Sequence, residues 1–256
     1  MNERAVRIAA PLVWGVMFLA SWEGFVRWRH IKALLLPAPS RIWTELRKNH
    51  SAIIDVTRNT ATNAVIGLVA GVAMAIAVAL LAERFGVLRS MITPMSAAMN
   101  TMPIVALGPI FYNLFGTTSA IPRRAVVAVV VFFPVFLNVV KGLTQIEPVH
   151  DELMRSYAAG DGAVLRHVRL PNALPFLMTG VRLAASLAVI AAVVVEYFGG
   201  LQNGLGSRVT SAMKSSANAR AWAYIVGACA LGIAFYCAAL LLERLAMPWQ
   251  ARRRDP

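Results

Sequence analysis

The chain has 256 residues, of which 58% are hydrophobic and only 14% are charged. A soluble domain usually has about a quarter of its residues charged, and the apolar residues here form long blocks of the length, roughly 20 residues, that crosses a bilayer as a helix. This composition excludes a soluble globular protein. The net charge of +13 does not indicate nucleic-acid binding, because the basic residues are spread over short segments between apolar blocks, where lipid headgroups are the natural counter-charge.

The first apolar block spans residues 8–25 and follows basic residues, as in a signal peptide. Pro11 interrupts the block, Trp14 and Trp22 accompany it, and no small-residue cleavage site is clear. We therefore expect an uncleaved first membrane span.

A proline-containing segment follows, with the sequence Leu36-Pro37-Ala38-Pro39-Ser40. Ser40 is expected to cap a short helix that starts just after the prolines. Ile42, Trp43 and Leu46 would form its apolar face, which predicts a helix on the membrane interface.

The second block spans residues 60–81. Small residues recur in it every four positions, and one polar residue lies a turn earlier: Gly67, Gly71, Ala75, Ala79 and Asn63. Small residues at this spacing let two helix backbones approach closely. The stripe is consistent with packing inside a helix bundle, and also with a subunit contact or a pore wall.

The third block, residues 88–115, contains Pro94, Pro103 and Pro109. Each proline removes a helix hydrogen bond, and irregular backbone at membrane depth requires burial in protein or a cavity to line. This block is therefore the candidate for a pore-lining helix, with a kinked structural helix as the alternative. The candidate substrate pathway in this block is made up of the polar residues Asn100 and Thr101 together with Met102.

Three further apolar blocks, near residues 125–140, 175–198 and 221–245, complete a single domain over residues 1–256 with about six spans. Two ionisable side chains, Arg182 and Glu196, fall in the fifth span. They are too far apart along a helix, about 21 Å, to pair with each other. Each is expected to contact headgroups or loops, or else to line the pathway, with Glu196 near its outer mouth and Arg182 near an inner gate.

The segment 147–174, between the fourth and fifth spans, is polar and differs in character from the rest. Asp151 and Glu152 suit a helix N-terminus, where the helix dipole favours negative charge. Gly160 fits the C-terminal cap of that helix, and Asp161 could cap a second one. The segment therefore predicts two short helices joined by a hinge.

The second of these helices is expected to end before Pro171, and Pro175 suits the first turn of the fifth span. A short helix joined rigidly to a membrane helix can pass force from a soluble partner into the membrane. An ordinary amphipathic loop on the membrane interface is the alternative that periodicity alone leaves open.

The same segment resembles the "EAA" loop of binding-protein-dependent ABC importer permeases. That loop has the pattern Glu-Ala-Ala, three residues, Gly, nine residues, Ile, one residue, Leu-Pro. Glu152 takes the Glu position, Val168 the Ile position, and Leu170 with Pro171 the closing pair, without a gap. The departures from the pattern are Leu153 and Met154 in place of the two alanines, and Ala158 in place of the glycine.

Most of the chain shares this resemblance. The segment from Leu36 to Ser40, the proline-rich third block and the run from Val195 to Gly200 are similar to the nitrate/sulfonate/taurine branch of these permeases. Some related permeases serve pyrimidine or flavin precursors.

The resemblance implies an all-α permease of the type I ABC importer kind, in the bacterial inner membrane, with a cytoplasmic coupling helix between its fourth and fifth spans. It implies a homodimer whose third or fifth span lines a central pathway, two ATPase subunits on the cytoplasmic side and an extracytoplasmic solute-binding protein. The cargo would be a small organic or oxyanionic nutrient, such as a sulfonate, taurine, nitrate or a pyrimidine or vitamin precursor. The residues that it assigns to ATPase coupling are Glu152, Met154, Tyr157, Ala158, Gly160, Leu170 and Pro171.

The chain itself is then expected to be non-catalytic and to bind no metal or cofactor. It has no phosphate-binding Gly-Lys-Ser/Thr loop, so ATP and Mg would be held by the partner ATPase. An intramembrane enzyme is disfavoured because all four histidines lie outside the expected spans and no cluster has metal-ligand spacing. A secondary transporter or channel-like pore without an ATPase is the remaining alternative, although it would be expected to carry inverted repeats and more polar groups in the membrane.

Charge bias does not settle the orientation of the chain. The positive-inside rule finds nearly equal numbers of basic residues on the two sides, and Arg27, Arg29 and Lys32, just after the first span, oppose the expected direction. The cytoplasmic location of segment 147–174 therefore rests on the resemblance. The residues do not identify the substrate.

Overall fold

The computed structural model describes residues 3–85 and 103–248, and every regular element within these ranges is helical. The helices, in chain order, are α1 (Glu3–Trp28), α2 (Pro39–Lys48), α3 (His50–Arg84), α5 (Ile104–Phe115), α6 (Ile121–Thr144), α7 (Pro148–Ser156), α8 (Asp161–Val164), a π-helical turn (Leu165–Arg169), α9 (Leu170–Phe198), α10 (Leu205–Lys214) and α11 (Asn218–Ala246).

Four helices in the described ranges are long and apolar enough to cross a membrane. They are α3, α6, α11 and the continuous helix Asp161–Phe198, which comprises α8, the π-helical turn and α9. The second, fourth, fifth and sixth apolar blocks lie within these helices. Helix α1 covers the first block and includes Pro11.

The third apolar block is described only from residue 103 onward. Pro103 has an extended backbone and precedes the short apolar helix α5, which contains Pro109. Pro94 and the candidate pathway residues Asn100, Thr101 and Met102 lie outside the described residues.

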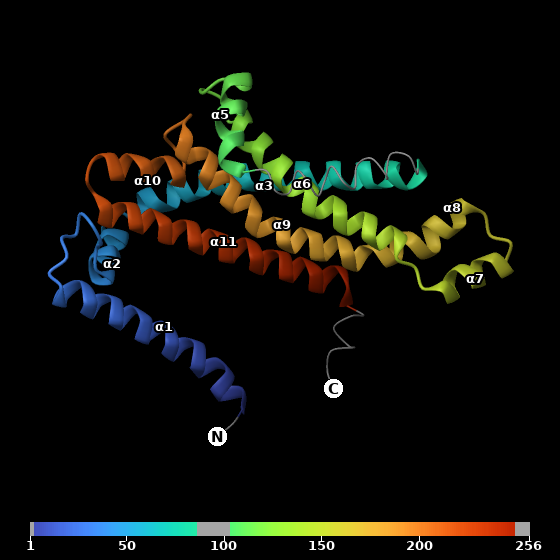
Figure 1. Cartoon of the computed structure of the whole chain (residues 1–256), viewed down its shortest axis with the longest axis horizontal. Coiled ribbons are helices and arrows are strands. Elements are labelled where there is room, and N and C mark those ends of the chain that lie inside the picture. The colour runs from blue at the N-terminus through green and yellow to red at the C-terminus, as the bar shows by residue number, and fades with distance from the viewer. Residues whose placement is uncertain (1–2, 86–102, 249–256) are drawn as a thin grey trace.

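Helix α6 packs between α3 and α9 in the centre of the bundle (Figure 1). The approach of α3 is very close, because a Cβ atom added to Gly67 would lie 2.5 Å from Cβ of Val127, and one added to Gly71 would lie 2.5 Å from the Ala128 carbonyl oxygen. The small-residue stripe of α3 is buried throughout. It therefore serves packing inside the chain, which settles the choice that the sequence left open.

Helix α1 lies at the side of the bundle and contacts mainly α2 (Figure 1). Its large apolar side chains are exposed, among them Leu12, Trp14, Val16, Met17 and Phe18. Apolar side chains on the outside of a helix of this length suit contact with lipid tails.

Helix α2 begins differently from the prediction. The residue at its N-cap is Ala38, Pro39 is the first helical residue, and no side chain caps the helix. Ser40 instead donates its hydroxyl hydrogen to the Glu23 carboxylate of α1, at 2.8 Å. Ile42 is buried and Leu46 partly buried against the bundle, whereas Trp43 is exposed.

Different short helices lie at the two ends of the molecule's long axis. Helices α7 and α8 lie at one end, and α2 and α10 lie at the other (Figure 1). The long helices of the bundle lie between these ends (Figure 1).

Candidate functional site

Helix α7 starts earlier and ends earlier than the predicted helix, which ran from Glu152 to Gly160. Glu147 is extended, Pro148 occupies the first turn, and the last helical residue is Ser156. Proline is favoured at the first helical position because its missing N–H would have no partner there. Asp151 and Glu152 consequently lie beyond the first three helical residues, not at the N-terminus.

The end of α7 is a Schellman motif centred on Ala158. The Ala159 N–H donates to the Met154 carbonyl at 3.0 Å, and the Ala158 N–H donates to the Arg155 carbonyl at 2.9 Å. Ala158 has a φ of +49°, the left-handed conformation in which glycine is usual. This is the position at which the resembling loop has glycine, so the prediction that Gly160 caps the helix is wrong.

Gly160 and Asp161 take different places at the helix ends from those predicted. Gly160 is extended, with a φ of −72°, and forms the N-cap of α8. Asp161 is the first residue of α8 and makes no side-chain cap. The hinge between the two helices is therefore formed by residues 157–160.

Because Ala158 adopts a left-handed conformation, replacing it with glycine is expected to stabilise the end of α7. A left-handed backbone costs an L-residue about 1–2 kcal/mol, and glycine avoids this cost although it loses more chain entropy on folding. Ala158→Gly should therefore slow hydrogen exchange of the α7 amides by about fivefold, a net gain of about 1 kcal/mol. Ala159→Gly is the matched control, because that residue has a negative φ and glycine there should speed exchange. Equal exchange in the two variants would contradict the prediction.

An apolar stripe runs along the outside of α7. Val149, Leu153 and Tyr157 recur every fourth residue, and their exposed fractions are 61%, 50% and 74%. Residues four apart share a helix face. Of the other residues that the resemblance assigns to coupling, Met154 is half-buried and Glu152 is exposed. Sequence reasoning missed Val149 and Leu153, although their four-residue spacing from Tyr157 could have indicated a shared helix face.

The connection from α8 into α9 is continuous. The predicted helix end before Pro171 is wrong, because a π-helical turn over Leu165–Arg169 carries the helix through, with the Leu170 N–H donating to the Leu165 carbonyl. A wider turn at this point accommodates the proline, which has no N–H to donate. Pro175 lies inside α9, beyond the first turn predicted for it.

Two polar contacts attach the start of α9 to neighbouring helices. The Asn172 amide donates to the carbonyl oxygens of Gly142 and Gln145 at the end of α6, both at 2.8 Å. Arg169, in the π-helical turn, forms an ion pair with Glu83 near the end of α3. Leu170 and Pro171 are exposed beside these contacts. Helices α8 and α9 are thus joined to both α3 and α6.

A fully buried ion pair lies toward the other end of the bundle. Arg123 near the start of α6 and Glu196 near the end of α9 have no exposed side-chain surface, and Nη1 of Arg123 is 3.7 Å from Oε1 of Glu196. A charge buried in this way is costly unless it is paired and hydrogen-bonded. The pair can stabilise the contact between α6 and α9 only if its remaining polar atoms also have hydrogen-bond partners.

Polar groups from other elements satisfy the Glu196 carboxylate. The Thr60 hydroxyl of α3 lies 2.9 and 3.1 Å from its two oxygens, and the Gly206 N–H donates to Oε2 at 3.2 Å. A Cβ atom added to Gly204 would lie 2.2 Å from the carboxylate carbon. Only glycine leaves room for the carboxylate there.

The Arg123 guanidinium binds the loop between α9 and α10. It donates to the Asn203 side-chain oxygen at 2.8 Å and to the Leu201 carbonyl, and its Nε lies 3.4 Å from the Tyr112 hydroxyl of α5. The ion pair therefore connects α3, α5, α6 and α9 with the loop that leads to α10. Sequence reasoning missed Arg123 because it stands just before the apolar block at 125–140.

Arg182 does not pair with Glu196, as expected from their separation along the helix. It pairs with another helix. Its Nη1 is 3.2 Å from Oε2 of Glu243 on α11. Each ionisable residue of the fifth span is therefore held by another helix. Both charges are paired within the described part of the chain, and a role of either residue in the pathway stays a prediction.

Comparison with known proteins identifies the family. Residues 63–247 match the model of the binding-protein-dependent transport system inner membrane component. The chain belongs to this family. It is the permease subunit of an ABC importer in the bacterial inner membrane, and members of this family generally work with ATPase and solute-binding subunits.

Individual relatives agree with the predicted branch. The chain is 29% identical to the formylaminopyrimidine transport permease protein ThiX of Halalkalibacterium halodurans, over 98% of this chain and 100% of the relative. It is 23% identical to the putative aliphatic sulfonates transport permease protein SsuC of Bacillus subtilis, over 91% of this chain and 85% of the relative.

A solved structure shows the same fold. The crystal structure of an amino acid ABC transporter with histidines contains a chain that matches with a TM-score of 0.63 at 15% identity, over 78% of this chain and 96% of that one. The type I permease architecture expected from the sequence is thereby confirmed.

Proposed function

We propose that α7 is the coupling helix of this importer and that its apolar stripe inserts into the ATPase subunit. The stripe of Val149, Leu153 and Tyr157 carries the proposal, because it is exposed on a helix that hardly touches the rest of the described chain. A stripe of this kind fits a partner groove in the helix-in-groove mode. In this arrangement α7 faces the cytoplasm, and α2 and α10 lie on the outer side.

Force from the ATPase then enters the bundle along two routes. The rigid helix from Asp161 to Phe198 carries it along α9, and the contacts of Asn172 and Arg169 carry it into α6 and α3. Glu196 and Arg182 hold helices together in this account and are not proposed to bind the solute. ATP and Mg would be held by the ATPase, and this chain would bind no cofactor.

The Arg169–Glu83 ion pair offers a test of force transmission that is separate from docking. Arg169→Glu should lower transport per ATP hydrolysed by about tenfold, since a hydrogen bond between charged groups contributes about 1.5–3 kcal/mol and two carboxylates would face each other. The double variant Arg169→Glu with Glu83→Arg restores opposite charges and should recover most of the transport. ATPase co-purification should stay unchanged in both. Equal transport in the single and double variants would exclude this route.

The cargo that we propose is a small organic or oxyanionic nutrient, with a pyrimidine-type vitamin precursor or a sulfonate as the leading classes. Support comes from the relatives named for formylaminopyrimidine and for aliphatic sulfonates. Two copies of the chain would enclose the pathway. Specificity would rest mainly on the extracytoplasmic binding protein.

Oriented vesicles that contain the chain, its ATPase and its binding protein test this function. We expect ATP-dependent uptake of a radiolabelled formylaminopyrimidine or alkanesulfonate that requires the binding protein. Net efflux, or transport of a peptide or a lipid in place of these solutes, would overturn the proposal. Uptake without any ATPase would favour a secondary transporter.

A further inference from the structure

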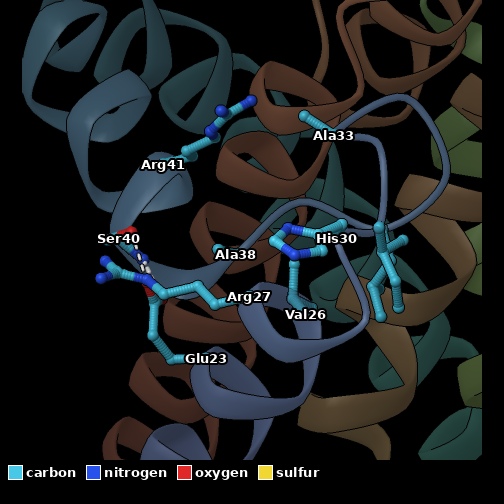
Figure 2. A pocket seen from close by; sticks show the side chains of 10 residues that line it. Glu23, Val26, Arg27, His30, Ala33, Ala38, Ser40 and Arg41 are labelled. Atoms are coloured by element: carbon cyan, nitrogen blue, oxygen red, sulfur yellow. Dashed lines mark hydrogen bonds and ion pairs between the residues drawn. The ribbon is translucent and has the colours of Figure 1, made fainter.

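A depression of about 540 Å³ lies between the end of α1, the loop after it and α2 (Figure 2). Its polar lining comes from three places along the chain: Glu23 and Arg27 of α1, His30 of the loop, and Ser40 and Arg41 of α2. The depression is at the end of the molecule opposite α7. It takes no part in the coupling contacts described above.

The charges around the depression do not balance. Glu23 accepts hydrogen bonds from the Ser40 N–H at 3.0 Å and the Ser40 hydroxyl at 2.8 Å, and it pairs with Arg27 at 2.6 Å. The Arg41 side chain is exposed and forms no hydrogen bond or ion pair within the described part of the chain. The site is therefore left with one unneutralised guanidinium, which favours a negatively charged ligand.

An apolar groove of about 480 Å³ adjoins the depression at Leu36, which lines both. The other groove residues are Phe18, Ser21, Trp22 and Phe25 of α1 and Trp222 of α11. Trp22 and Trp222 meet edge to face with ring centroids 5.3 Å apart. The groove extends from the polar depression toward the middle of α1, deeper into the expected first span.

The level of the depression in the membrane is marked by tryptophans. Trp28 is 76% exposed and Trp43 is 55% exposed, as is usual for side chains among lipid headgroups. Arg27, Arg29 and Lys32 cluster here although the orientation with α7 in the cytoplasm puts them on the outer side. Binding of a negatively charged membrane component explains why basic residues gather where the positive-inside rule disfavours them.

We propose that the depression and the groove together bind one anionic phospholipid. The headgroup phosphate pairs with the Arg41 guanidinium, and an acyl chain follows the groove past Trp22 and Trp222. Which leaflet supplies the lipid rests on the proposed function, but the binding itself does not.

Native mass spectrometry of the purified full chain, titrated with phosphatidylglycerol or phosphatidylcholine, tests this site. Phosphatidylglycerol is expected to bind the more tightly. Arg41→Gln should weaken its binding about fivefold, the effect of one basic side chain at an anionic lipid surface. Arg41→Lys keeps the charge and should stay within about twofold of the unaltered chain. Arg47→Gln is the matched control, because Arg47 is on the same helix, is exposed and lies over the Trp43 ring outside the depression.

Three results would overturn the proposal. Equal binding of the two lipids would remove the role of charge, and equal weakening by Arg41→Gln and Arg47→Gln would show general surface attraction. Competition by glycerol phosphate at the same concentration as the lipid would show a site for a free anion without the acyl groove. None of these measurements involves transport or the ATPase, so their failure is distinguishable from failure of the proposed function.

Discussion

Arg123→Ala is expected to lower the free energy of unfolding by about 3–5 kcal/mol, because removing one partner of a buried ion pair leaves an uncompensated charge. Glu196 would stay buried between Thr60 and the Gly204–Gly206 backbone, and the Leu201 and Asn203 oxygens would lose their donor. Thermal unfolding in detergent, followed by tryptophan fluorescence, measures the effect.

Two further variants separate the ion pair from a general effect of removing arginine. Arg208→Ala removes an exposed arginine of α10 and should change stability by less than about 0.5 kcal/mol. Arg123→Met combined with Glu196→Leu removes both charges and should recover part of the loss, since apolar replacements of a buried pair are often tolerated. If Arg123→Ala unfolds at the temperature of Arg208→Ala, the pair does not hold these helices together.

Tyr157→Ala should weaken binding of the ATPase subunit about 30-fold, which corresponds to about 2 kcal/mol for a central aromatic anchor. Tyr157 is 74% exposed in the isolated chain, so its removal leaves no cavity in the bundle and the spans should still fold. Titration of the purified permease with ATPase measures the affinity.

The control for this variant is Tyr236→Ala, because Tyr236 is also exposed, at 43%, but lies on the membrane helix α11. It should bind the ATPase like the unaltered chain. An affinity of Tyr157→Ala equal to that of Tyr236→Ala would remove Tyr157 from the interface.

The membrane helices could be predicted because their signals are local. An apolar block long enough to span the bilayer is readable without knowledge of its neighbours, and the four-residue period of Gly67 and Gly71 predicts a close helix contact. What the period could not reveal was the partner. That partner, α6 with Val127 and Ala128, follows only from the three-dimensional packing.

Polar features at helix ends and between distant segments were harder to predict. Sequence rules place glycine at a helix C-terminus, and they therefore selected Gly160 in place of Ala158, which adopts the left-handed conformation despite its Cβ. Arg123 and Glu196 lie on different helices far apart in the sequence, so no local pattern predicts that they pair. The prediction that Pro171 ends a helix was wrong because a π-helical turn accommodates it.

The most direct test of the account is photo-cross-linking from the exposed end of α7. A photoreactive phenylalanine analogue at position 157, in the complex with the ATPase, should form a covalent adduct with the ATPase subunit. The same analogue at position 28, where Trp28 is equally exposed but lies at the far end of the bundle, should form none. Absence of the adduct at position 157 in a complex that retains its ATPase, or equal adducts at both positions, would contradict the assignment of α7 as the coupling helix.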